Sequence, residues 1–272
     1  MRLLFLGDIV GRSGRTGIVE SVPNLRKKLG LEFVVVNGEN AAGGFGITEE
    51  ICNAVFDAGV DVITTGNHAF DQRESIGIFD SEPRLLRPLN YPKDVPGKGV
   101  GVYESKSGKR VLVINAMGRI FMDPLDDPFA AVDRELEACK LGWGCDASIV
   151  DFHAEATSEK MAMGHYCDGR ASLIIGTHSH VPTADAQVLP RGSAYQTDAG
   201  ATADYDSVIG MEKTEPLTRF TRRVSTNRMQ PAQGPATVCG VFVETDDATG
   251  LSLRIDPVRL GGRLKPAMPE VS

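Results

Sequence analysis

Short runs of apolar residues recur along the chain, and each is followed by a polar turn and then by a stretch with helical spacing. This alternation is typical of a layered α/β fold, because strands that are covered on both faces are apolar throughout. The pattern therefore predicts an α/β protein with buried central strands. The predicted strands are 3–6, 33–36, 60–64, 111–114, 148–152 and 172–175.

The same pattern predicts two helices and a hairpin. Between the first two strands, apolar residues recur at spacings of four, three and four, and Gly30 is placed to end that helix. Thr48, followed by two glutamates, is a candidate N-cap for a helix that reaches Gly59. Residues 237–244 and 251–255 flank a turn rich in Asp and Gly and predict a β-hairpin. The apolar stripe of the first helix is Ile18, Val22, Leu25 and Leu29.

Composition narrows the class of protein. The chain has 272 residues, 42% of them hydrophobic, which excludes a disordered, collagenous or coiled-coil protein. No repeat or linker interrupts the sequence, so we expect a single domain over residues 1–272. The formal net charge is −7, which argues against a basic face that could hold a long nucleic acid. A small anionic substrate is compatible with this net charge if positive charge is supplied locally at the site.

The cysteines and the N-terminal residues indicate the cellular compartment. The five cysteines are scattered and form no C-x-x-C pair, which is typical of reduced intracellular thiols. The apolar run 3–6 is too short for a signal-peptide core or a membrane span. We therefore expect a cytoplasmic protein with no membrane partner.

Polar side chains follow five of the predicted strands. Ligand sites of open α/β sheets lie beyond the carboxyl ends of the strands. One Asp or Asn at such a place is more often a turn or a helix cap, but five coincident placements predict a mixed oxygen and nitrogen site for Mn, Fe or Zn. There are more ligands than one ion needs, and Glu39 can bridge two ions about 3.5–4 Å apart. The candidates are Asp8, Glu39, Asn40, Asn67, His68, His153, His178 and His180.

Four other residues have weaker claims on a site. His165 lies within a predicted helix, and we assign it a structural role. Arg12, Lys160 and Arg170 lie near the polar motifs and can contact phosphate, although such residues are more often surface charges.

The polar motifs resemble those of the calcineurin-like metallophosphoesterases. Gly66-Asn67-His68 and Gly176-Thr177-His178-Ser179-His180 follow Gly7-Asp8 and Asn37-Gly38-Glu39-Asn40 in the order typical of that superfamily. Val10 stands where the superfamily has a histidine, and Glu39-Asn40 replaces its Gly-Asp-x-x-Asp motif, which indicates a subfamily. Residues 7–12, 37–44 and 151–160 closely resemble the bacterial 2′,3′-cyclic-nucleotide 2′-phosphodiesterase branch, and the similarity runs to about Phe220.

The resemblance implies a four-layer α/β/β/α sandwich with two mixed central sheets and a site for two ions, Fe or Mn with Zn as a further option. By position, Asp8, Glu39, Asn40 and His180 resemble the ligands of the first metal ion. Glu39, Asn67, His153 and His178 resemble those of the second, and His68 matches the catalytic histidine. The resemblance leads us to expect Met and Gly-Pro where this chain has Ala201 and Ala203-Asp204, and this departure leaves open the contacts at the substrate mouth but not the metal site.

The implied activity is hydrolysis of 2′,3′-cyclic nucleotides and related small phosphodiesters by a metal-bridging hydroxide, with His68 protonating the leaving ribose oxygen. Asp71 is placed to orient His68, or else it is only an exposed helix cap. Two alternatives stay open: a phosphomonoesterase or nucleotidase that uses the same site, and a non-catalytic, metal-stabilised regulatory or RNA-associated protein. The family also suggests a homo-oligomer.

Overall fold

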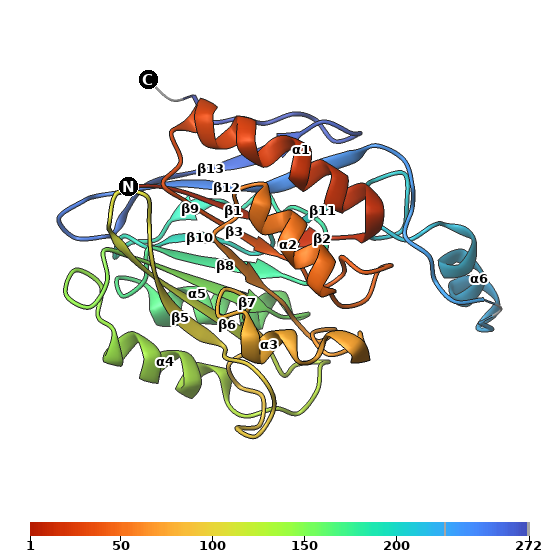
Figure 1. Cartoon of the computed structure of the whole chain (residues 1–272), viewed down its shortest axis with the longest axis horizontal. Helices are drawn as coiled ribbons and strands as arrows, with labels where there is room; N and C mark the ends of the chain where they lie inside the picture. Colours follow the sequence, from red (N-terminus) through yellow and green to blue (C-terminus); the bar gives the residue numbers. More distant parts are fainter. Residues whose placement is uncertain (226, 271–272) are drawn as a thin grey trace.

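Two mixed β-sheets packed face to face form the centre of the structure, and helices cover the outer face of each sheet (Figure 1). The computed structural model describes residues 1–225 and 227–270. Its layers run helix, sheet, sheet, helix, which confirms the predicted four-layer α/β/β/α sandwich.

The first sheet has the strand order β2-β11-β12-β1-β3-β4, and β13 pairs with β12. The strands β1, β3 and β4 run parallel, whereas β12 is antiparallel to β1 and forms the predicted hairpin with β13. The bounds are β1 (Arg2–Leu6), β2 (Asp8–Ile9), β3 (Phe33–Asn37), β4 (Val62–Thr64), β11 (Ala201–Asp204), β12 (Ala236–Thr245) and β13 (Ser252–Leu260).

The second sheet has the strand order β5-β6-β7-β8-β10-β9. Its four inner strands are parallel, and the two edge strands are antiparallel to their neighbours. The bounds are β5 (Val100–Glu104), β6 (Arg110–Met117), β7 (Ala147–His153), β8 (Leu173–Thr177), β9 (Gln187–Val188) and β10 (Ala194–Gln196).

The two predicted helices form where the sequence indicates. Gly30 ends α1 with a φ of 62°, a left-handed conformation that glycine adopts without strain, and its N–H donates to Arg26 O. The Thr48 side chain caps α2 by accepting from Ile51 N at 3.4 Å. The helices are α1 (Gly11–Leu29), α2 (Glu49–Asp57), α3 (Ile78–Ser81), α4 (Pro128–Ala138), α5 (Thr157–Cys167) and α6 (Thr214–Arg222), with a 3₁₀ turn, η1, at Arg73–Ser75.

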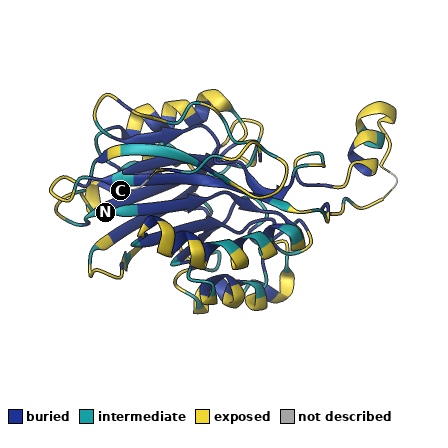
Figure 2. Ribbon diagram, turned by 90° about the horizontal axis from the view of Figure 1, so that it is seen from above, coloured by how far each residue is buried: buried dark blue, intermediate teal, exposed yellow. Residues whose placement is uncertain are grey.

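Alternation along the central strands explains why their sequences are apolar on both faces. In β1, Leu4 and Leu6 pack with α1 and α2, whereas Leu3 and Phe5 point into the interface between the sheets. The second sheet behaves in the same way, with Val113 facing the first sheet and Leu112 facing α4 and α5. Figure 2 shows the buried residues concentrated on the strands and the exposed ones on the outer helices and loops.

One segment extends away from the sandwich. We call residues 208–225 and 227–231 the arm; it carries α6 and projects beyond both sheets (Figure 1). A bridge between Met211 and Pro231, and a hydrogen bond of 2.8 Å from Glu212 N to Gln230 O, tie the two sides of the arm together at its base.

All five cysteines are free thiols, in agreement with the sequence prediction. Over residues 1–225 and 227–270, none of the helices combines the length and apolar character needed to cross a membrane.

Candidate metal centre

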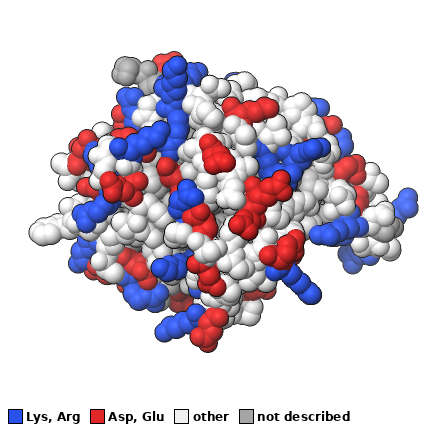
Figure 3. All heavy atoms as spheres, in the orientation of Figure 1, with Lys and Arg blue, Asp and Glu red and all other residues white. Residues whose placement is uncertain are grey.

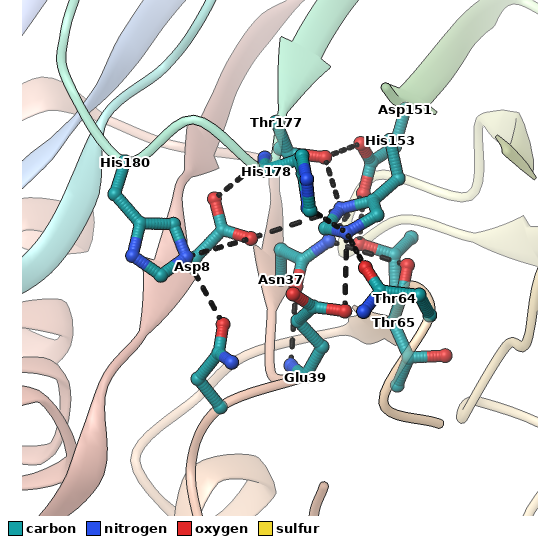
Figure 4. Close-up of polar contacts among 12 residues, drawn as sticks. Asp8, Asn37, Glu39, Thr64, Thr65, Asp151, His153, Thr177, His178 and His180 are labelled. Carbon is teal, nitrogen blue, oxygen red and sulfur yellow. Dashed lines mark hydrogen bonds and ion pairs between the residues drawn. The ribbon is translucent and has the colours of Figure 1, made fainter. Parts of the chain in front are cut away.

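The predicted site residues come together where the carboxyl ends of strands from both sheets meet (Figure 4). The first sheet contributes Asp8 and the residues that follow β3 and β4, and the second contributes the residues that end or follow β7 and β8. The sequence predicts these residues at the edge of a single sheet. The structure differs because the sheets lie face to face, so that two rows of strand ends face a common space.

One group of side chains is arranged around His153. Glu39 Oε2 lies 3.1 Å from His153 Nε2, Asn67 Oδ1 lies 3.0 Å from the same nitrogen, and His178 Nδ1 lies 3.1 Å from it. All these atoms carry lone pairs, and a single proton on His153 Nε2 cannot satisfy three of them. The arrangement therefore suits a cation.

A second group shares Glu39 with the first. Asp8, Glu39 and His180 offer ligand atoms that all lie within 4.8 Å of one another, as do those of Glu39, His153 and His178. Asn40 Oδ1 lies 3.1 Å from His180 Nε2. Asp8 Oδ1 is buried and has no hydrogen-bond partner within the described part of the chain. A buried carboxylate oxygen without a partner is costly unless a cation neutralises it.

Gly66 leaves room beside both groups. A Cβ atom at this position would lie 2.2 Å from His153 Nε2 and 2.3 Å from Glu39 Oε2. Only glycine permits the loop after β4 to pass this close to the cluster. The donor set of carboxylate, amide oxygen and imidazole, together with this space, fits transition-metal ions.

Each histidine of the cluster is oriented through its other ring nitrogen. His180 Nδ1 donates to Ile209 O at 2.8 Å, and His178 Nε2 lies 3.1 Å from Glu155 Oε2. His153 Nδ1 lies 2.9 Å from Thr177 Oγ1, which donates to Asp151 Oδ1 at 2.7 Å. Such outer contacts fix the tautomer and turn the opposite nitrogen towards a metal ion.

Asp151 anchors this outer network, although it was not predicted from the sequence as a site residue. Its carboxylate is fully buried and also accepts from Thr64 Oγ1 at 2.5 Å and from Asn37 Nδ2 at 2.9 Å. The available signal was an aspartate inside the otherwise apolar run 148–152. Burial raises the pKa of Asp151, although its hydrogen bonds and the charge of His153 oppose that shift.

The loop that carries two predicted ligands has an unusual backbone. His178 and His180 have φ values of 95° and 65°, a region that non-glycine residues rarely adopt. Between them, Ser179 donates to Asp198 Oδ2 through its N–H at 3.1 Å and its hydroxyl at 2.6 Å. Lys160 Nζ completes this network, because it donates to the same Asp198 oxygen and to Ser179 Oγ.

Lys160 is therefore a structural residue rather than a phosphate contact. Its side chain is 1% exposed and is paired with Asp198. Of the other weak candidates, His165 is exposed on α5 and is not among the residues that line the cavity at the site, and Arg170 pairs with Asp133 on α4.

Charge and burial shift the pKa values within the cluster. Burial raises the pKa of Asp8 to about 7. Burial also acts on Glu39 and His153, but their mutual attraction outweighs it, so the pKa of Glu39 falls to about 2 and that of His153 rises to about 9. Burial and the charge of His153 lower the pKa of His178 to about 3. Without an ion, the cluster thus holds a proton on His153 and none on His178 near neutral pH.

His68 stands beside the two groups. Its backbone N–H donates to Glu39 Oε2 at 3.3 Å, and its Nδ1 lies 2.8 Å from Asp71 Oδ2. The contact with Asp71 is the one that the sequence suggested. Asp71 is half exposed, so the pair lies at the surface of the site rather than within it.

Ala201 and Ala203-Asp204, which depart from the pattern expected of the branch, lie in β11. Ala201 is buried in β11 and lies opposite Asp8 in the strand register. Asp204 is also buried and accepts from Gly234 N at 2.8 Å. None of the three residues is among those that line the cavity at the candidate metal centre.

Comparison with known proteins places this chain in a family. Residues 4–258 match the model of a family described as YmdB-like protein. The chain belongs to the YmdB-like protein family. A curated relative, the 2′,3′-cyclic-nucleotide 2′-phosphodiesterase of Bacillus subtilis (strain 168), is 45% identical over 259 residues, which cover 95% of this chain and 96% of the relative. The resemblance drawn from the motifs is thereby confirmed.

Two solved structures share this YmdB-like fold over nearly the whole chain. A hypothetical protein from Thermus thermophilus is 42% identical with a TM-score of 0.89, covering 97% of this chain and 100% of that one. A structure described as a novel phosphatase from Mycoplasma pneumoniae is 32% identical with a TM-score of 0.89, covering 96% of this chain and 93% of that one.

Proposed function

We propose that this YmdB-like chain is a metal-dependent phosphodiesterase that hydrolyses 2′,3′-cyclic nucleotides and related small phosphodiesters. The observation that carries the proposal is the position of Glu39, which belongs to both groups of ligand atoms. A shared carboxylate between two sets of imidazole and oxygen donors suits two adjacent ions. The name of the Bacillus subtilis relative supports the substrate class.

In this proposal, Asp8, Glu39, Asn40 and His180 hold one ion. Glu39, Asn67, His153 and His178 hold the other. Iron and manganese suit these oxygen and nitrogen donors, and zinc is a further option. Two such ions neutralise phosphate oxygens and lower the pKa of water. They also account for how an acidic chain, with a net charge of −7, holds an anionic substrate.

His68 is the proposed proton donor. Its Nδ1 is held by Asp71, which leaves Nε2 to donate to the leaving oxygen of the substrate. The carboxylate of Asp71 fixes the plane of the ring. No side-chain nucleophile is required, because water supplies the attacking oxygen.

A substrate panel tests this function against its alternatives. Protein purified without chelators and loaded with Mn or Fe is assayed on 2′,3′-cyclic AMP, an aryl phosphodiester and an aryl phosphomonoester. We expect turnover of the two diesters and much slower turnover of the monoester. Preference for the monoester would favour the nucleotidase alternative. Tight binding of cyclic nucleotide without turnover would favour a non-catalytic protein.

A further inference from the structure

Apolar side chains line part of the cavity at the candidate metal centre. This cavity has a volume of about 310 Å³, and its lining includes predicted ligands such as Glu39, His178 and His180, together with His68. Four further lining residues are apolar: Phe45, Ile209, Met211 and Met229. Holding ions does not require them, and Ile209 remains 53% exposed despite its apolar side chain. We call these four residues the apolar wall.

Phe45 places the apolar wall next to the proposed proton donor. Its ring meets the His68 ring edge to face, with the centroids 5.1 Å apart. The ring is half buried, so part of its surface is open to a ligand. Because His68 is proposed to protonate the leaving oxygen, the group attached to that oxygen lies near Phe45.

The rest of the wall comes from the arm. Ile209, Met211 and Met229 lie at its base, where the hydrogen bond between Glu212 and Gln230 holds its two sides together. Methionine side chains adapt to flat aromatic ligands and make favourable sulfur contacts with them. The arm thus contributes two adaptable side chains to a site whose ligand-bearing floor is polar.

The arm also brings positive charge to an acidic protein. Its sequence contains five Lys and Arg residues but only two glutamates, and Figure 3 shows basic side chains on the projecting arm. The guanidinium carbon of Arg228 lies 5.7 Å from the centroid of the Phe45 ring, within the range of a cation–π contact. Arg228 therefore stands at the rim of the wall with its charge near the site.

We propose that the apolar wall binds the nucleobase of the substrate, with Phe45 as the stacking surface and Arg228 as the cation at its rim. The inference rests on the proposed function, and it assigns the enzyme's preference for substrates with a base to these residues. Aromatic side chains stack on bases of any sequence, because every base has a π-face. The cavity volume falls at the lower end of the roughly 300–1,000 Å³ typical of small-molecule sites. The site should therefore prefer phosphodiesters that carry a base.

The test compares two substrates that differ only in the base. We measure kcat/KM for 2′,3′-cyclic AMP and for ribose 2′,3′-cyclic phosphate, using the manganese-loaded full chain. The native protein should favour the nucleotide by about tenfold or more. Phe45→Leu keeps an apolar contact for His68 but removes the aromatic face, so it should lower this preference about tenfold, mainly through KM.

A second variant and a control separate binding from folding. Met229→Ala should lower the preference about threefold, and it carries the test if Phe45→Leu fails to fold. Phe220→Ala is the matched control, since Phe220 is 81% exposed on α6 and is not part of the cavity lining. This variant should keep the native preference.

The possible failures are distinguishable. If Phe45→Leu and Met229→Ala lower kcat/KM equally for both substrates, these residues only support the structure of the site. That result would contradict the proposal that the apolar wall binds the base, but it would leave the proposed function intact. The same holds if the native protein does not discriminate between the substrates. If the metal-loaded native protein turns over neither substrate, the proposed function fails and the inference falls with it.

Discussion

Lys160 and Asp198 form a buried ion pair directly behind the loop that carries His178 and His180. The distance from Nζ to Oδ2 is 2.7 Å, and the two side chains are 1% and 0% exposed. Asp198 also accepts both hydrogen bonds from Ser179 and one from Gly200 N at 2.8 Å. The pair therefore supports a loop whose two histidines have positive φ values.

Removing the lysine should destabilise both the fold and the site. Lys160→Met leaves the Asp198 carboxylate buried without its counterion, which costs about 3–5 kcal/mol. Urea unfolding measures this loss, and metal titration should show weaker binding because the histidine loop loses support. Arg134→Met is the control, since it breaks an exposed pair with Glu135 that contributes about 0–1 kcal/mol. Equal stabilities of the two variants would contradict the role of Lys160.

A methyl group at Gly66 should abolish metal binding. The added Cβ would lie within 2.3 Å of both His153 Nε2 and Glu39 Oε2, so these two ligands would have to separate. Gly66→Ala should therefore retain less than one ion per chain by elemental analysis. Gly77→Ala serves as the control, because Gly77 has helical backbone angles and an added Cβ would meet nothing within 4 Å. Full metal content in Gly66→Ala would refute this reading of the site.

Loss of the proposed proton donor should affect turnover but not metal binding. His68→Ala should reduce kcat on 2′,3′-cyclic AMP by about 10²–10⁴-fold. Elemental analysis should find the metal content of the native protein, because neither proposed ligand group includes the His68 side chain. A folded but metal-free His68→Ala protein would contradict the assigned roles.

Asp71→Asn tests how His68 is oriented. The substitution keeps a polar contact to His68 Nδ1 but removes the negative charge that lies 2.8 Å from it. We expect kcat on 2′,3′-cyclic AMP to fall while the metal content stays that of the native protein, because the imidazole loses the carboxylate that fixes the plane of its ring. Equal kcat values for variant and parent would restrict Asp71 to a structural role.

Metal binding should release protons at neutral pH. The neighbouring carboxylates outweigh burial and raise the pKa of His153 to about 9, so the metal-free site holds this proton at about pH 7 and must lose it to bind an ion. Metal affinity should consequently rise with pH between about 7 and 9. Calorimetry at neutral pH in two buffers of different ionisation enthalpy should give different observed heats. Equal heats would mean that no proton leaves.

The sequence predicted the central strands and the cluster of candidate ligands because both depend on local signals. Strands covered on two faces must be apolar, and polar residues directly after them mark the ligand edge. The edge strand β5 was missed because its residues are only partly buried, so its sequence carries no comparable run. The roles of Asp151 and Lys160 could not be predicted for another reason. Their partners, such as Asn37 and Asp198, are distant in sequence, and only the packed sheets bring them together.

The contacts of the arm with the site could not be predicted from the sequence either. Its sequence reads as a polar, basic segment with one short helix, and nothing in it indicates that Met211 and Met229 meet at the site. That relationship depends on the return path of the chain through Pro231, which is fixed by backbone pairing with Met211.

We propose that the Glu39 carboxylate binds two ions. Anomalous diffraction from crystals of the manganese-loaded protein, recorded alongside elemental analysis, locates these ions and counts them. We predict two ions per chain, both bound by the Glu39 carboxylate, and a Glu39→Ala variant that has lost at least one of them. A single ion per chain, or two ions of which only one contacts Glu39, would contradict the account.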